Sequence, residues 1–143
     1  VFPKESQELV SILKDMPQSR IKALMSLSDN LAELNYKRFQ RYSQPFDLSN
    51  AKQAVYAFRG DTYVGLDVDS LKSGDVDYAQ DHLAILSGLY GVLRPLDLMQ
   101  PYRLEMGTKL ANDKGETLYD FWKERLTKQI EDMVADHKDK TII

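Results

Sequence analysis

Three arginines lie beside residues that bend or stiffen the backbone. Arg59, Arg94 and Arg103 each adjoin a glycine or lie within two residues of a proline. A guanidinium group can hold a phosphate through two parallel hydrogen bonds, so arginines beside turns are typical of surfaces that bind phosphate backbones. Arg94 and Arg103 could instead pair with Asp97 and Glu105 and fix the local chain, and the residues alone slightly favour this local role.

Two glycines, Gly88 and Gly91, enclose an apolar pair between Arg59 and Arg94. Their spacing predicts a strand end at residues 85–87, a glycine turn, about one helical turn around Val92, and a strand over residues 102–106. Such an arrangement leaves backbone N–H groups free at a helix N-terminus, which attracts anions. A helix-hairpin-helix module grips a duplex backbone in this way, although it usually has one residue between the glycines, and this chain has two.

The sequence lacks the motifs that usually mark common enzyme classes and metal sites. The chain has no P-loop, dinucleotide-binding, zinc-protease or serine-hydrolase motif, so an enzyme is unsupported, although a pocket of Arg94, Tyr102, Arg103 and Glu105 remains an alternative. The absence of cysteine and the presence of only two histidines leave few ligands for a transition metal, and we expect no cofactor. Iron handling by Asp and Glu ligands is a further hypothesis. The acidic residues within 61–69 lack calcium-loop spacing and are interpreted as helix caps.

Composition places the chain among ordinary globular proteins. With 143 residues, 43% of them apolar and 29% charged, it is expected to form a single domain over residues 1–143. The net charge of −3 gives no overall attraction for a polyanion, so any nucleic-acid surface must be local. No apolar run reaches the ~20 residues that span a bilayer, and the first residues do not resemble a signal peptide, so we expect a cytoplasmic protein.

Periodicity predicts the elements that must position these residues. Helices are expected over residues 5–16, from about 21, after Ser28, over 73–84, and from Leu118, where Trp122 belongs to the core stripe. A buried strand is expected over residues 54–58 because of its β-branched and aromatic content. Helices mixed with strands predict an α/β (α+β) fold with a central sheet. The chain ends in a β-branched run that reads as a strand cut short.

A basic cluster, Lys37, Arg38 and Arg41, lies on the third expected helix. It could meet phosphate. A solvated helix face is the favoured interpretation, because exposed helix faces are commonly charged.

Three blocks of sequence resemble the signature blocks of the bacterial peroxide stress protein YaaA family: Ser87–Leu98, Gln100–Gly107 and, upstream, Ala57–Leu66. The resemblance extends more weakly over both flanking helical regions. Compared with the family, the chain looks like an internal fragment that lacks the first strand and the C-terminal part.

The resemblance implies an α/β fold with a central sheet and a helix-hairpin-helix element. It also implies binding of double-stranded DNA with low sequence specificity and a role in limiting free iron and oxidative damage during peroxide stress. The residues in matching blocks that we expect to form the DNA-binding site are Arg59, Gly60, Gly88, Tyr90, Gly91, Arg94, Tyr102 and Arg103.

Overall fold

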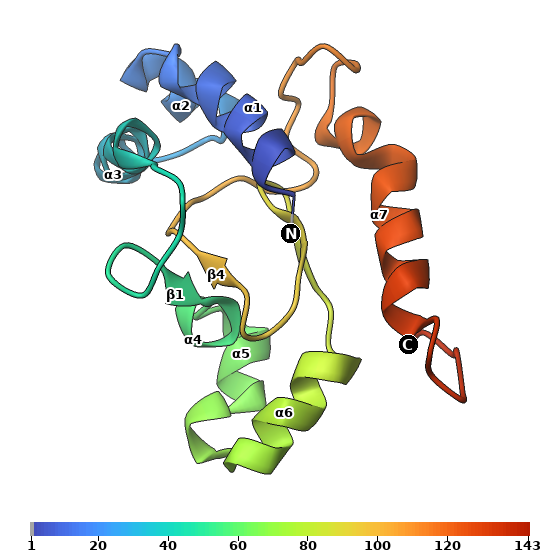
Figure 1. Ribbon diagram of the computed structural model, residues 1–143. Coiled ribbons are helices and arrows are strands. Elements are labelled where there is room, and N and C mark those ends of the chain that lie inside the picture. Colours follow the sequence, from blue (N-terminus) through green and yellow to red (C-terminus); the bar gives the residue numbers. More distant parts are fainter. Residues whose placement is uncertain (1) are drawn as a thin grey trace.

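A computed structural model describes residues 2–143 (Figure 1). The elements in order are α1 (Pro3–Lys14), α2 (Gln18–Leu24), α3 (Asp29–Arg41), β1 (Lys52–Gln53), α4 (Ala54–Ala57), α5 (Asp61–Leu66), a 3-10 turn η1 (Val68–Ser70), α6 (Ser73–His82), β2 (Ile85–Ser87), β3 (Gly91–Leu93), β4 (Leu98–Met99) and α7 (Leu118–Val134). The predicted mixed α/β class is confirmed. Within residues 2–143, every helix is too short or too polar to cross a membrane.

The strands form two small antiparallel sheets instead of one continuous central sheet. Strand β1 pairs with β4, and β2 pairs with β3 in a hairpin whose register sets Ile85 opposite Leu93 and Ser87 opposite Gly91. Each strand has only two or three residues. Most of the core is therefore supplied by helices and by the segments between them.

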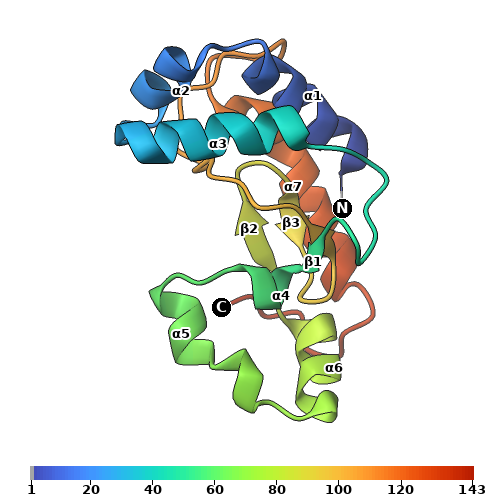
Figure 2. The same ribbon diagram turned by 90° about the vertical axis from the view of Figure 1, so that its left-hand side faces the viewer.

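Helices α1, α2 and α3 pack together at one end of the molecule, and α3 lies above the turn end of the hairpin in Figure 2. Helix α1 buries Leu9, Val10 and Leu13 completely, as its apolar spacing predicts. The expected cap at Ser28 is confirmed, because its hydroxyl accepts a hydrogen bond from the backbone N–H of Leu31 at 3.4 Å.

Helix α7 is broken at Lys123, whose φ of +29° is not helical, and it packs against β3. It begins where the sequence predicts. The prediction that Trp122 belongs to the core is also confirmed, since the side chain is 1% exposed and lies beside buried Phe121. The apolar stripe is buried only near the start of the helix, and Ile130 and Met133 farther along are partly exposed.

Three predicted local structures are wrong. Residues 91–93 form strand β3 instead of a helical turn, because Gly91 has a φ of +74° that turns the chain back onto β2. Residues 54–57 form a helix, and the backbone N–H groups of Ala54 and Val55 bond to carbonyls of the 95–97 segment. Tertiary contacts therefore override the strand propensity of this stretch. Residues 102–106 have no strand partner.

Candidate functional site

The candidate site is built around the tight turn between β2 and β3. The carbonyl oxygen of Gly88 accepts a hydrogen bond from Nε1 of Trp122 at 2.9 Å, and the N–H of Tyr90 donates to Oγ of Ser87 at 2.8 Å. The turn is thus buried and its polar groups are used internally. The expected anion site at a helix N-terminus is wrong here, because strands flank the turn on both sides and no helix-hairpin-helix forms at these glycines.

Close packing explains both glycines of the turn. A Cβ atom at Gly88 would lie 2.3 Å from the carbonyl oxygen of Leu104, and one at Gly91 would lie 2.9 Å from the ring of Trp122. Gly88 thus allows the 103–109 segment to pass directly over the hairpin. Residues 87–91 are buried, so they support the segment that carries Arg103 and expose no side chain that could contact a ligand.

Two tyrosines connect the hairpin to the segment that follows it. The hydroxyl of Tyr90 lies 3.0 Å from the carbonyl oxygen of Gln100 and 3.1 Å from its N–H, and the hydroxyl of Tyr102 lies 2.6 Å from Oγ of Ser87. The two rings meet edge to face with centroids 5.2 Å apart. Burial raises the pKa of Tyr102 to about 12 and raises that of Tyr90 further, so both hydroxyls stay protonated at neutral pH.

The Gln100 side chain extends this network to the chain that leaves α3. Its Oε1 accepts from the N–H of Ser43 and its Nε2 donates to the carbonyl oxygen of the same residue, both at 3.2 Å. Gln100 itself is buried. The 99–104 segment is therefore fixed from both sides, which explains how a segment without regular structure can hold Arg103 in place.

The three arginines lie on separate parts of the surface. Arg59 is exposed and its guanidinium lies 3.7 Å from the carboxylate of Asp69, whereas that of Arg103 lies 3.5 Å from Glu105. Arg94 is partly exposed and its guanidinium makes no ion pair within residues 2–143; its backbone N–H donates to the Asp97 carboxylate at 2.7 Å, and its carbonyl oxygen accepts from the Asp97 N–H at 3.1 Å. The three side chains line three different pockets that have no residue in common.

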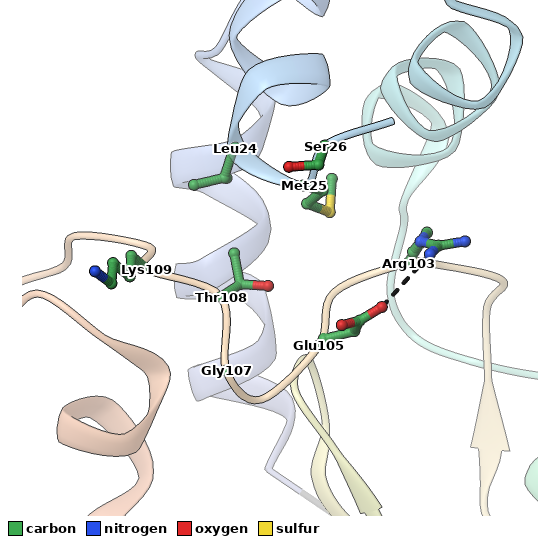
Figure 3. A pocket seen from close by; sticks show the side chains of 8 residues that line it. All are labelled: Leu24, Met25, Ser26, Arg103, Glu105, Gly107, Thr108 and Lys109. Atoms are coloured by element: carbon green, nitrogen blue, oxygen red, sulfur yellow. Dashed lines mark hydrogen bonds and ion pairs between the residues drawn. The ribbon is translucent and has the colours of Figure 1, made fainter. Parts of the chain in front are cut away.

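Arg103 lines the largest of these three pockets, with a volume of about 410 Å³ (Figure 3). One wall comes from the corner between α2 and α3, at Leu24, Met25 and Ser26. The other wall is the 103–109 segment, with Arg103 and Glu105 toward one end of the view and Lys109 toward the other. Sequence reasoning missed Ser26, Thr108 and Lys109, because no spacing along the chain indicates that the α2–α3 corner lies against this segment.

Only two of the four residues of the alternative enzyme pocket line one pocket together. Arg103 and Glu105 line the same pocket, but Tyr102 is absent from its lining, and Arg94 belongs to the smaller pocket between α6, β3 and α7. In the described part of the chain, no three His, Asp or Glu side chains gather closely enough to hold a metal ion.

On α3, Lys37 pairs with Glu33, and Arg41 is exposed.

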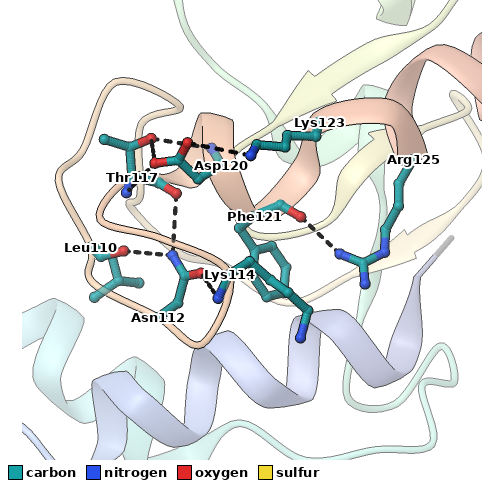
Figure 4. A network of polar contacts seen from close by, with 8 residues as sticks. All are labelled: Leu110, Asn112, Lys114, Thr117, Asp120, Phe121, Lys123 and Arg125. Carbon is teal, nitrogen blue, oxygen red and sulfur yellow. Dashed lines mark hydrogen bonds and ion pairs between the residues drawn. The ribbon is translucent and has the colours of Figure 1, made fainter.

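A second polar network fixes the loop that leads into α7 (Figure 4). The Thr117 hydroxyl accepts from the N–H of Asp120 at 3.1 Å, and the Asp120 carboxylate accepts in return from the N–H of Thr117 at the same distance. Asn112 donates to the carbonyl oxygens of Leu110 and Thr117. This capping box sets the start of α7, and thereby the position of Trp122 under the hairpin turn.

Comparison with known proteins agrees with the resemblance of the sequence blocks. A protein of Shewanella loihica (strain ATCC BAA-1088 / PV-4), described as a UPF0246 protein, is 50% identical over 140 residues. The aligned region covers 98% of this chain and 54% of that relative, so the chain spans about half the length of the relative. The sequence model of the family described as peroxide stress protein YaaA matches residues 1–143, and the chain belongs to this family.

Proposed function

We propose that this chain acts in the resistance to peroxide stress by binding double-stranded DNA through its phosphates in the cytoplasm, and that it thereby helps to limit free iron and oxidative damage. Membership of the peroxide stress protein family supports the stress role. The DNA and iron roles are the expectations that accompany the family resemblance.

One observation carries the DNA proposal. Arg59 and Arg103 project from irregular segments with 67% and 47% of their side chains exposed, and each has a single, exposed carboxylate partner at more than 3.4 Å. Exposed ion pairs of this kind contribute about 0–1 kcal/mol, so a phosphate group competes with them at little cost. Of the other expected contact residues, Gly60 is also exposed. Arg94 is partly exposed and can add a contact from its own pocket.

The remaining expected residues have a supporting role in this proposal. Gly88, Tyr90 and Gly91 are buried, and the Tyr102 hydroxyl is held by Ser87. They hold the Arg103 segment in a fixed position, which lowers the entropy that the arginine loses on binding.

The test is a salt titration of duplex binding by the full-length protein. Because each neutralised phosphate releases counterions, the logarithm of the binding constant should fall linearly with the logarithm of salt concentration, by about 0.9 per phosphate contact. The double variant Arg59→Gln/Arg103→Gln should make this slope shallower by about 2. A matched control, Lys128→Gln/Lys138→Gln, removes the same charge from exposed residues that line none of the three pockets.

Two results would refute the proposal. One is the absence of duplex binding at low salt. The other is an equal loss of slope in the control and in the arginine variant, which would show that only net charge matters.

A further inference from the structure

The pocket between α6, β3 and α7 contains hydrogen-bond donors that the protein does not use. It has a volume of about 240 Å³ and is lined by Gln80, Val92, Arg94, Asp97, Gln129 and Met133. The guanidinium group of Arg94 and the side-chain amide of Gln129 make no hydrogen bond within residues 2–143. All six lining residues are buried or only partly exposed, so these donors belong to a concave site and not to an open surface.

Backbone groups occupy acceptors of the same pocket. Oδ2 of Asp97 accepts from the backbone N–H of Arg94 at 2.7 Å, and Oε1 of Gln80 accepts from the N–H of Leu96 at 2.8 Å. The Asp97 carboxylate thus binds the backbone of Arg94 and makes no ion pair with its guanidinium. The end of the Gln80 amide that is left without a partner in the described chain is its NH₂ group. The pocket therefore offers mainly donors.

Met133 contributes a thioether to this pocket. It lies four residues after Gln129 on α7, which places the two side chains on one face of the helix. The chain has five methionines and no cysteine, so thioethers are its only oxidisable sulfur atoms. A water molecule needs only about 10–15 Å³ of cavity space, so hydrogen peroxide, which is slightly larger, fits in this pocket.

We propose that hydrogen peroxide oxidises Met133 to methionine sulfoxide in this pocket before it oxidises the other methionines. A lone pair of the sulfur attacks one peroxide oxygen, so that an S–O bond forms and the O–O bond breaks. The sulfur loses two electrons and the peroxide gains them. The departing hydroxide takes the proton of the transferred oxygen and leaves as water. The inference goes beyond the proposed function, because it assigns a covalent modification.

The unused donors favour both this reaction and its product. Negative charge develops on the departing oxygen, and donors that are already in place stabilise that charge. A sulfoxide oxygen is a stronger acceptor than a thioether sulfur, which accepts only weakly. The new oxygen can accept from the Arg94 guanidinium or the Gln129 amide. Oxidation would then link α7 to the turn at residues 94–97.

The other methionines lack this combination and serve as internal comparisons. Met16 and Met106 are partly exposed but line none of the three pockets. Met25 shares a pocket with Arg103, whose guanidinium is already paired with Glu105. Met99 is 3% exposed and should be oxidised last.

The test exposes the full-length protein to hydrogen peroxide and follows each methionine by mass spectrometry of its peptide. We expect Met133 to be oxidised at least three times faster than Met16 and Met106 at every peroxide concentration. In the oxidised protein, the Nε–H resonance of Arg94 should shift in an NMR spectrum of arginine side chains. Oxidation of Met133 at the same rate as Met16 and Met106, or more slowly, would overturn the inference.

Matched variants test the role of the guanidinium. Arg94→Gln should slow the oxidation of Met133 about three- to tenfold, since one hydrogen bond to a developing charge is worth about that factor, and should leave Met16 unchanged in the same sample. Arg41→Gln removes the same group from an exposed position on α3 outside the three pockets, and should leave Met133 unchanged. Equal slowing of Met133 in both variants would refute the role of the Arg94 donor. The comparison among methionines in the wild type does not depend on either variant.

The oxidation assay contains no DNA, so its result is separate from that of the duplex titration. Selective oxidation of Met133 in a protein that does not bind duplex would refute the proposed function alone. Duplex binding without selective oxidation of Met133 would refute this inference alone.

Discussion

Substitution of Gly88 by alanine tests whether the hairpin turn supports the Arg103 segment. The added Cβ would lie 2.3 Å from the Leu104 carbonyl oxygen, roughly 1 Å short of the 3.4 Å at which ordinary contact begins. The neighbouring atom is backbone, so no flexible side chain can move aside. Overpacking of this kind costs about 1–3 kcal/mol. We therefore expect Gly88→Ala to lower the free energy of unfolding by this amount and to displace residues 103–105.

The measurement is urea unfolding followed by circular dichroism, with the m-value compared between variants. Gly60→Ala is the matched control, since no atom lies within 4 Å of its added Cβ and its φ of −72° suits alanine. Alanine lowers the entropy of the unfolded chain, which stabilises the fold, but it caps α5 less well than glycine does. Because these two effects nearly cancel, the free energy of unfolding should change by no more than about 0.5 kcal/mol. If Gly88→Ala is as stable as Gly60→Ala, the close approach of the two segments is refuted.

Three further predictions concern the groups around the turn. Trp122→Phe leaves a buried carbonyl without its donor and should lower the free energy of unfolding by about 1–3 kcal/mol; a loss below about 0.5 kcal/mol in chemical unfolding would contradict the hydrogen bond. Because the pKa of Tyr102 is about 12 in the folded state and 10.0 ordinarily, its stabilisation is fully present below pH 10 and is lost as pH rises toward 12. Tyr102→Phe should therefore flatten the alkaline fall in stability, whereas an unchanged profile would show that the Tyr102 hydroxyl is not buried in the folded state. Thr117→Ala removes a helix cap and should destabilise by about 0.5–2 kcal/mol, and Asp120→Asn by less; thermal melts that place both at the wild-type midpoint would exclude the capping box.

Regular features with local causes were predicted from the sequence. The helix from Leu118, the cap at Ser28 and the burial of Trp122 follow from apolar spacing and short-range hydrogen bonds, which act within a few residues. The mixed α/β class follows from the same patterns. These properties do not depend on which distant segments meet.

Features that depend on distant contacts were not predicted. The composition of the chain around Val92 is compatible with a helical turn or a strand. It forms a strand because Gly91 has a positive φ and because the segment pairs with β2. Residues 54–57 became helical because backbone groups of the 95–97 segment accept their hydrogen bonds. The pocket at Arg103 could not be foreseen, because Ser26 meets Thr108 only through the packing of α2 against a segment about 80 residues away.

We propose that the exposed side chains of Arg59 and Arg103 bind duplex phosphates, and that the buried hairpin holds the Arg103 segment in place. The most direct measurement is backbone amide NMR of the full-length protein during titration with a short duplex. We expect shifts at residues 59–60 and 103 and unchanged resonances for Gly88 to Tyr90 in the buried turn. Shifts that leave residues 59–60 and 103 untouched and gather elsewhere, for example on α7, would contradict it.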